Sequence, residues 1–181
     1  HNWAVNGLNY YVLAQLLWDP AQNVDDIIED YCQKGFGKAA DIMKKYFLHC
    51  EKLTAKLAES RAENIREVED LTNRPQGFID FFMNSFTDAE MEKLQAMLDK
   101  ARSVVTDDTE ALQRVEFIAA GLDFTRNRIE FVRAYKKLYA QKNKQELRKL
   151  AAKHREYWQK VFKKYPFAVN IPSLAVSQYY S

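Results

Sequence analysis

Glycine, proline and cysteine are scarce in this 181-residue sequence, which has five, four and two of them. Sandwiches, barrels and collagen-like chains need frequent turns, so the shortage of glycine and proline argues against all three. No run of about 18 apolar residues occurs, which excludes a membrane-spanning helix. Hydrophobic residues make up 47% of the chain and charged residues 29%, which is enough for a core and a polar surface. The length fits one domain, residues 1–181.

Catalytic and cofactor motifs are also missing. The sequence has no phosphate-binding loop, dinucleotide fingerprint or serine-nucleophile elbow. Its three histidines, His1, His49 and His154, are not spaced as metal ligands. We therefore predict no catalytic residue, no metal site and no cofactor. His154 lies on an apolar stripe, and we expect a hydrogen-bonded histidine in the core or at its boundary.

The remaining reactive side chains have simpler structural explanations. Adjacent carboxylates at helix starts normally act as caps or as partners of the helix dipole, and we expect this of Asp25-Asp26, Glu29-Asp30 and Asp107-Asp108. Cys32 and Cys50 are predicted to be free thiols, because a turn at residues 35–37 would offset them by roughly 15 Å along two antiparallel helices.

Helical periodicity runs through most of the chain. Apolar residues recur at steps of three and four, and proline or glycine marks several breaks. The residue pair Thr87 and Glu90 has the spacing of a capping box, and Asn143 can cap the last helix. The predicted helices cover residues 7–18, 24–35, 39–57 with a weaker extension to 71, a short segment in 78–86, 87–105, 108–141 and 143–165.

The helix predicted over residues 108–141 carries two apolar stripes. One contains Val115, Ile118 and Leu122, and the other contains Phe117, Phe124 and Phe131 among its members. Two apolar faces require two neighbours, and Gly121 within this helix indicates a close helix crossing. We predict an all-α, irregular helical bundle with a long central helix. The uncharged segment 167–181 is expected to lie against the bundle as an extended C-terminal tail, and the alternative is a frayed terminus.

Charge is distributed unevenly along the chain. Residues 133–164 contain 12 lysines and arginines but only Glu146 and Glu156 as acids, although the whole chain has a net charge of only +2. The favoured interpretation is that this basic helix lies beside acidic helices with its lysines in solvent. We therefore predict no nucleic-acid binding. The alternative is a free-standing interaction module whose basic last helix binds an acidic partner.

The N-terminus combines planar aromatic side chains with amides. This combination can stack on sugar faces and hydrogen-bond to sugar hydroxyls, although aromatic residues in a short helix can also belong to the core. The residues concerned are Asn2, Trp3, Asn6, Asn9, Tyr10, Tyr11 and Trp18.

Two segments carry a resemblance to a known family. The runs NWAVNGLNYYVLAQLLWDP (residues 2–20) and VDDIIEDYCQKGFGKAADIMKKYF (residues 24–47) resemble a bacterial domain-of-unknown-function family. That family occurs in the C-terminal half of large proteins related to alpha-glucuronidases and other barrel-type glycoside hydrolases. The matching features are Trp3 with Gly7-Leu8 and Tyr10-Tyr11, then Leu16 to Pro20, Gly35-Phe36-Gly37 and Tyr46-Phe47. Residues 72–181 carry no motif of this kind.

The resemblance implies a C-terminal helical module of a secreted or periplasmic protein. Such a module follows a (β/α)₈ barrel, and residues 1–20 would belong to that barrel or pack on it. Its expected role is non-catalytic: it would buttress the barrel or mediate association, including a homodimer, in polysaccharide breakdown. The catalytic carboxylates would then lie upstream, because barrel enzymes place them at strand ends. Asn2, Trp3 and Asn6 are the expected carbohydrate-binding residues.

Overall fold

A computed structural model describes residues 3–64 and 85–166, with only the backbone for residues 56–64. The predicted all-α fold is confirmed, and no strand occurs within these ranges. The predicted short helix at 78–86 lies almost wholly outside the described residues, as do the extension beyond residue 64 and the tail 167–181.

The elements are α1 (Trp3–Trp18), α2 (Val24–Phe36), the 3₁₀ turn η1 (Gly37–Ala39), α3 (Ala40–Asn64), α5 (Asp88–Val104), α6 (Thr109–Ala140) and α7 (Lys144–Lys164).

Side-chain caps fix the starts of four helices, since each accepts a hydrogen bond from a backbone N–H that would otherwise have no partner. The predicted caps Thr87 and Asn143 accept from the third residue that follows, at 3.3 and 3.2 Å. Asp108 caps α6 in the same way at 2.9 Å. Asn23, which was not predicted as a cap, accepts from the N–H of Asp25 at 2.7 Å.

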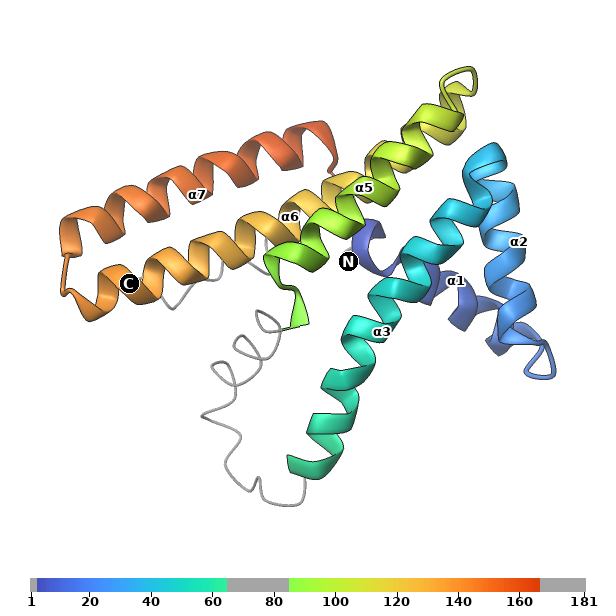
Figure 1. The fold of residues 1–181 in the computed structure, drawn as a ribbon, viewed down its shortest axis with the longest axis horizontal. Helices are drawn as coiled ribbons and strands as arrows, with labels where there is room; N and C mark the ends of the chain where they lie inside the picture. The colour runs from blue at the N-terminus through green and yellow to red at the C-terminus, as the bar shows by residue number, and fades with distance from the viewer. Residues whose placement is uncertain (1–2, 65–84, 167–181) are drawn as a thin grey trace.

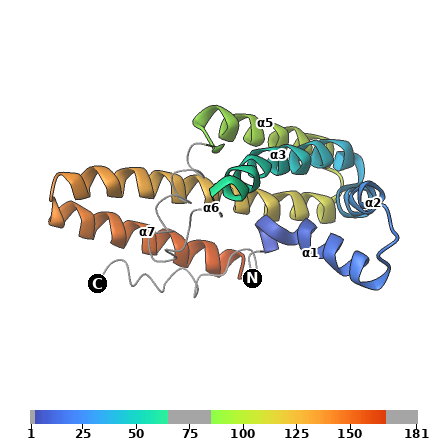
Figure 2. The ribbon, with the colours of Figure 1, turned by 90° about the horizontal axis from the view of Figure 1, so that it is seen from below.

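Helix α6 is the centre of the bundle (Figure 1). Seen from below, α3 and α5 lie on one side of α6, whereas α1 and α7 follow one another along the other side (Figure 2). The first predicted stripe, with Val115, Ile118 and Leu122, is buried in the main core. The second stripe meets α7, where the Phe124 ring lies 4.1 Å from that of Trp158. The prediction of a central helix with two apolar faces is therefore confirmed.

Helices α1 and α6 cross at close range. A Cβ built on Gly121 would lie 3.0 Å from the carbonyl oxygen of Ala4 and 3.1 Å from its Cβ, and Ala4 is 5% exposed. Only glycine on one helix and a small residue on the other allow the two backbones to approach this closely. The prediction that Gly121 marks a crossing is confirmed.

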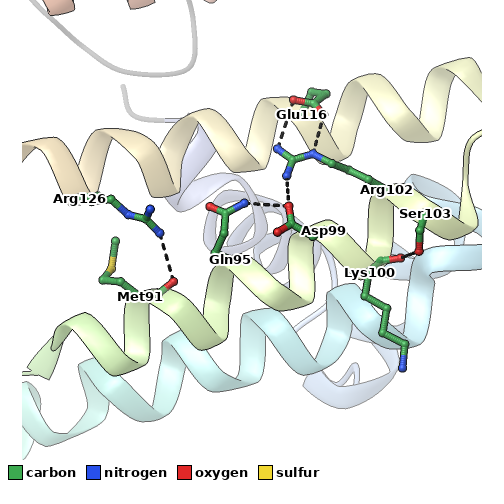
Figure 3. Close-up of polar contacts among 8 residues, drawn as sticks. All are labelled: Met91, Gln95, Asp99, Lys100, Arg102, Ser103, Glu116 and Arg126. Atoms are coloured by element: carbon green, nitrogen blue, oxygen red, sulfur yellow. Dashed lines mark hydrogen bonds and ion pairs between the residues drawn. The ribbon is translucent and has the colours of Figure 1, made fainter.

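Polar contacts tie α5 to α6 along their exposed edge (Figure 3). The Arg102 guanidinium donates to both carboxylate oxygens of Glu116, at 2.6 and 3.3 Å, and to Asp99 on its own helix at 2.5 Å. Further along, Arg126 donates to the carbonyl oxygen of Met91 at 3.4 Å. Since a bidentate arginine–carboxylate pair constrains geometry as well as energy, the Arg102–Glu116 pair adds to the apolar contacts that hold α5 on α6.

Replacing Gly121 tests the α1–α6 crossing. We expect Gly121→Leu to lower the free energy of unfolding by about 1–3 kcal/mol, because the added side chain overpacks the contact with Ala4. Urea unfolding followed by circular dichroism measures the change. Gly35→Ala is the matched control, since nothing lies within 4 Å of its added Cβ, and it should cause no loss. Equal stability of Gly121→Leu and the parent would contradict this crossing.

Candidate functional site

Helix α1 is an unusual surface helix because it has no charged residue from Trp3 to Trp18. Ala4 is the one buried residue in it, while Leu13, Leu17 and Trp18 are 55%, 77% and 90% exposed. Uniformly hydrophobic helices are normally surrounded by other apolar groups. The exposed apolar side chains therefore make α1 the candidate site, and a hollow lies on each side of it.

The first hollow, the α1 groove, has a volume of about 450 Å³ and lies between α1, α2, α3 and α6. Val5, Leu13 and Val24 line it and are each about half exposed. Its polar lining includes the side-chain amides of Asn6 and Asn9 and the exposed carboxylate of Glu51. The groove is thus an open apolar surface edged by amides.

The second hollow, the aromatic pocket, has a volume of about 380 Å³ and lies between α1, α2 and α6. Trp3 and Tyr10 meet edge to face with ring centroids 4.8 Å apart, and Tyr11 and Tyr31 are 5.2 Å apart. Phe117 of α6 completes the aromatic lining, and Gly7, Ala14 and Ile118 also line the pocket.

Hydrogen bonding fixes one wall of the aromatic pocket. The Tyr11 hydroxyl donates to Asp30 at 2.8 Å, and Lys34 lies 2.7 Å from the other oxygen of that carboxylate. The hydrogen bond to the Asp30 carboxylate raises the pKa of Tyr11. The bond from Lys34, followed by that from Tyr11, lowers the pKa of Asp30. Asp30 is therefore a negatively charged anchor for the Tyr11 ring.

Trp3 and Asn6, two of the three predicted carbohydrate-binding residues, are not brought together. Asn2 lies outside the described residues, Trp3 lines the aromatic pocket, and Asn6 lines the α1 groove. The prediction placed all three before the helix, but Trp3 and Asn6 lie within α1 (Trp3–Trp18). Trp3 and Asn6 therefore line different hollows.

Two residues of the aromatic pocket were missed as site residues. Tyr31 was recognised only as part of the periodic pattern of residues 24–35, and Phe117 only as part of the second stripe of the central helix. Both face α1, which the sequence pattern of either helix alone does not reveal. Gly7 is a sequence signal for a close neighbour of α1, and that neighbour is Tyr31: a Cβ added to Gly7 would lie 3.4 Å from the Tyr31 hydroxyl.

The acidic pairs divide between two roles. Asp25 and Asp26 lie in the first turn of α2, and Asp108 caps α6, as predicted. Glu29 and Asp30 correct the prediction, because they lie in the middle of α2. Glu29 binds Lys44 of α3 at 2.6 Å. This pair therefore joins helices rather than capping one.

The histidines make unlike contacts. Nε2 of His49 lies 2.5 Å from the Glu90 carboxylate, linking α3 to α5. The His154 ring stacks on Phe131 at 4.0 Å with an interplanar angle of 14°. Its Nε2 is buried and has no hydrogen-bond partner among the described residues, so the predicted hydrogen bond is absent there. The α6–α7 interface presents aromatic rings to His154 instead of acceptors.

The cysteines are free, as predicted, with Cys32 buried and Cys50 partly buried. Burial raises the pKa of Cys32 to about 11 and that of Cys50 to about 12. The thiols therefore stay protonated at neutral pH. Across residues 3–64 and 85–166, no group of three or more histidine, cysteine or acidic side chains could hold a metal ion.

The basic segment forms an arm together with the end of α6. Helix α7 packs chiefly on α6, and residues 126–164 contain 14 lysines and arginines against three acids. This arrangement corrects the expectation that the basic helix lies beside acidic ones. Most of the basic side chains are exposed, and Lys149 and Lys160 pair with acids one turn away on α7.

No helix in the described part of the chain combines the length and apolar character needed to cross a membrane. Residues 1–48, which span α1, α2, η1 and the beginning of α3, match a family model described as a domain of unknown function (DUF4838). The match includes the residues that carry the resemblance and supports its description as a domain of unknown function. The chain matches no curated protein and no solved structure.

The pH dependence of stability tests the environment of His154. Burial, with a smaller effect of the Arg128 charge, lowers the pKa of His154 to about 4, whereas an unfolded histidine titrates near pH 6.5. The neutral form is favoured in the folded chain, so its stabilisation is complete above about pH 6.5 and is lost as the pH falls toward about 4. We expect a loss of about 1–3 kcal/mol after allowing for solvent screening.

The matched variant for this test is His154→Phe, which keeps a ring against Phe131 and does not titrate. The difference in free energy of unfolding between the parent and the variant, measured in urea across this pH range, isolates the contribution of His154. A difference that does not change with pH would contradict the buried, neutral imidazole.

Proposed function

We propose that this chain is a non-catalytic helical module of a secreted or periplasmic glycoside-hydrolase-like protein that takes part in polysaccharide breakdown. Its role is to buttress a preceding (β/α)₈ barrel, which docks on the α1 groove. The observation that carries the proposal is the charge-free, exposed apolar surface of α1. The resemblance of residues 2–47 supplies the barrel as the partner.

The chemistry of the α1 groove suits a folded domain. Covering a fully exposed leucine or valine contributes about 1.5–3 kcal/mol, and Val5 and Leu13 in this groove are each at least half exposed. Contiguous apolar surface of this kind marks an interaction site. The amides of Asn6 and Asn9 at its edge can hydrogen-bond to a partner's backbone, as the rim of an interface does.

The absence of catalysis is part of the same proposal. Glycoside hydrolysis commonly needs two carboxyl groups about 5–10 Å apart, one of them held protonated. Glu29 and Asp30 are instead bound by Lys44 and Lys34, and these bonds lower the pKa of both carboxyls. Partial burial raises the pKa of Asp123, so Asp123→Asn is the first variant to examine if the chain shows turnover.

Self-association of the chain tests the α1 groove. Without the barrel, we expect the chain to form reversible oligomers through this groove, and Leu13→Glu to shift them toward monomer because a carboxylate cannot be buried unpaired. Sedimentation velocity over a range of concentrations measures the shift. Tyr139→Glu is the control, since Tyr139 is 66% exposed at the far end of the molecule. An equal shift in both variants would contradict the assignment.

The gene sequence upstream of the His1 codon gives an independent check. Barrel strands and a signal peptide there support the proposal, whereas an initiator methionine directly before His1 would remove it.

A second candidate function rests on the α6–α7 arm, which could bind an acidic partner. The observation that favours it is the concentration of exposed basic residues on this arm, in which α7 packs chiefly on α6. The arm is joined to α5 by the bond between Arg133 and Asp88, at 2.6 Å. Lys137, Arg148 and Lys153 are exposed, so a polyanion can reach them.

Binding to duplex DNA distinguishes the two candidates. If the basic side chains are simply solvated, affinity for a labelled duplex should be weak and should disappear near about 150 mM salt, because scattered lysines release few counterions together. Fluorescence anisotropy at low and physiological salt measures this. Submicromolar affinity at physiological salt would favour the arm as the functional surface.

A further inference from the structure

We propose that the aromatic pocket binds one pyranose ring of a neutral saccharide. The pocket is formed by Trp3, Tyr10 and Tyr11 of α1, Tyr31 of α2 and Phe117 of α6. The biological context of the inference rests on the proposed role in polysaccharide breakdown, but the binding chemistry is argued from the pocket itself.

The shape of the pocket suits a flat, partly apolar ring. Its volume of about 380 Å³ falls in the range of about 300–1,000 Å³ that small-molecule sites occupy. Trp3 is 45% exposed and meets Tyr10 edge to face, so part of the indole surface remains open to a ligand. A pyranose can lay its C–H face on such a ring while its hydroxyl groups stay in water.

The absence of charge in the lining selects the class of saccharide. Among the described residues that line the pocket, none has a charged side chain. Asp30, just behind Tyr11, is already bound by the Tyr11 hydroxyl and by Lys34. An anionic or cationic ligand would lose hydration here without gaining an ion pair. A neutral sugar loses little, because its polar edge can remain solvated.

The lining is organised before a ligand arrives. The Asp30 bond holds the Tyr11 ring, and Tyr31 packs between Tyr11 and the core ring of Phe36, at 5.2 and 5.9 Å. Gly7 leaves space above the Tyr31 hydroxyl. Rings that are fixed in place lose little conformational freedom on binding, so a single sugar ring can bind with a dissociation constant of about 1 mM.

Tryptophan fluorescence of the full chain tests the inference. The chain has three tryptophans, of which Trp158 is buried and Trp18 is 90% exposed. In a Trp18→Phe background, Trp3 is therefore the main exposed reporter. The probes are cellotetraose, xylotetraose and mannotetraose, with tetragalacturonate and adenosine for comparison, each up to about 10 mM.

We expect at least one neutral tetrasaccharide to change the Trp3 emission saturably, with tetragalacturonate binding at least tenfold more weakly. Trp3→Ala and Tyr10→Ala should each weaken binding at least tenfold in calorimetry, whereas Trp18→Ala, on the same helix, should leave it unchanged. Circular dichroism and the urea midpoint confirm folding of each variant. If Trp3→Ala does not fold, Tyr10→Ala carries the test.

Three results would overturn the inference: no binding of any neutral probe, binding that survives both Trp3→Ala and Tyr10→Ala, or tighter binding of adenosine than of any saccharide. Chromatography of the recovered probe shows whether the saccharide has been hydrolysed, and this separates the pocket assignment from the proposed non-catalytic role. An intact saccharide agrees with a non-catalytic module. Hydrolysis of a probe that binds the pocket would contradict the non-catalytic role and leave the pocket assignment standing.

Discussion

The contact of Gly121 with Ala4 is the constraint on which the site depends. Because the two backbones touch there, α1 is drawn onto α6 at a point where neither helix has a bulky side chain. Next to that point the larger side chains of α1 are covered only in part, since Trp3 and Val5 stay 45% and 50% exposed. The α1 groove and the aromatic pocket are therefore the two flanks of a single helix crossing.

The sequence was informative where one helix decides the outcome. The two stripes of residues 108–141 depend only on the helical period, and the caps Thr87 and Asn143 depend on residues within one turn, so both could be predicted. Gly121 could be assigned to a crossing because glycine in the middle of a helix otherwise lowers stability. The partner in that crossing, Ala4, could not be identified, since alanine gives no sign of what it packs on.

The errors share a physical origin in contacts between helices. Asp30 looked like a dipole partner but anchors Tyr11. The His154 side chain was expected to find an acceptor, yet its neighbours across the α6–α7 interface are the rings of Phe131 and Trp158. The residues that line the aromatic pocket come from three helices that are far apart in the sequence. Each of these features depends on which faces meet, and periodicity within one helix does not determine that.

The packing of α7 has a consequence for how the molecule opens. Among the described residues α7 rests chiefly on α6, whereas α6 itself continues into the core formed with α3 and α5. Releasing α7 would expose one aromatic interface and leave that core intact, so the two parts form cooperative units of unequal stability. Amide hydrogens in α7 would then exchange through opening of the arm, and those around Val115 only through opening of the whole bundle. Helix α6 therefore belongs to both units, because it packs on α7 toward one end and in the main core toward the other.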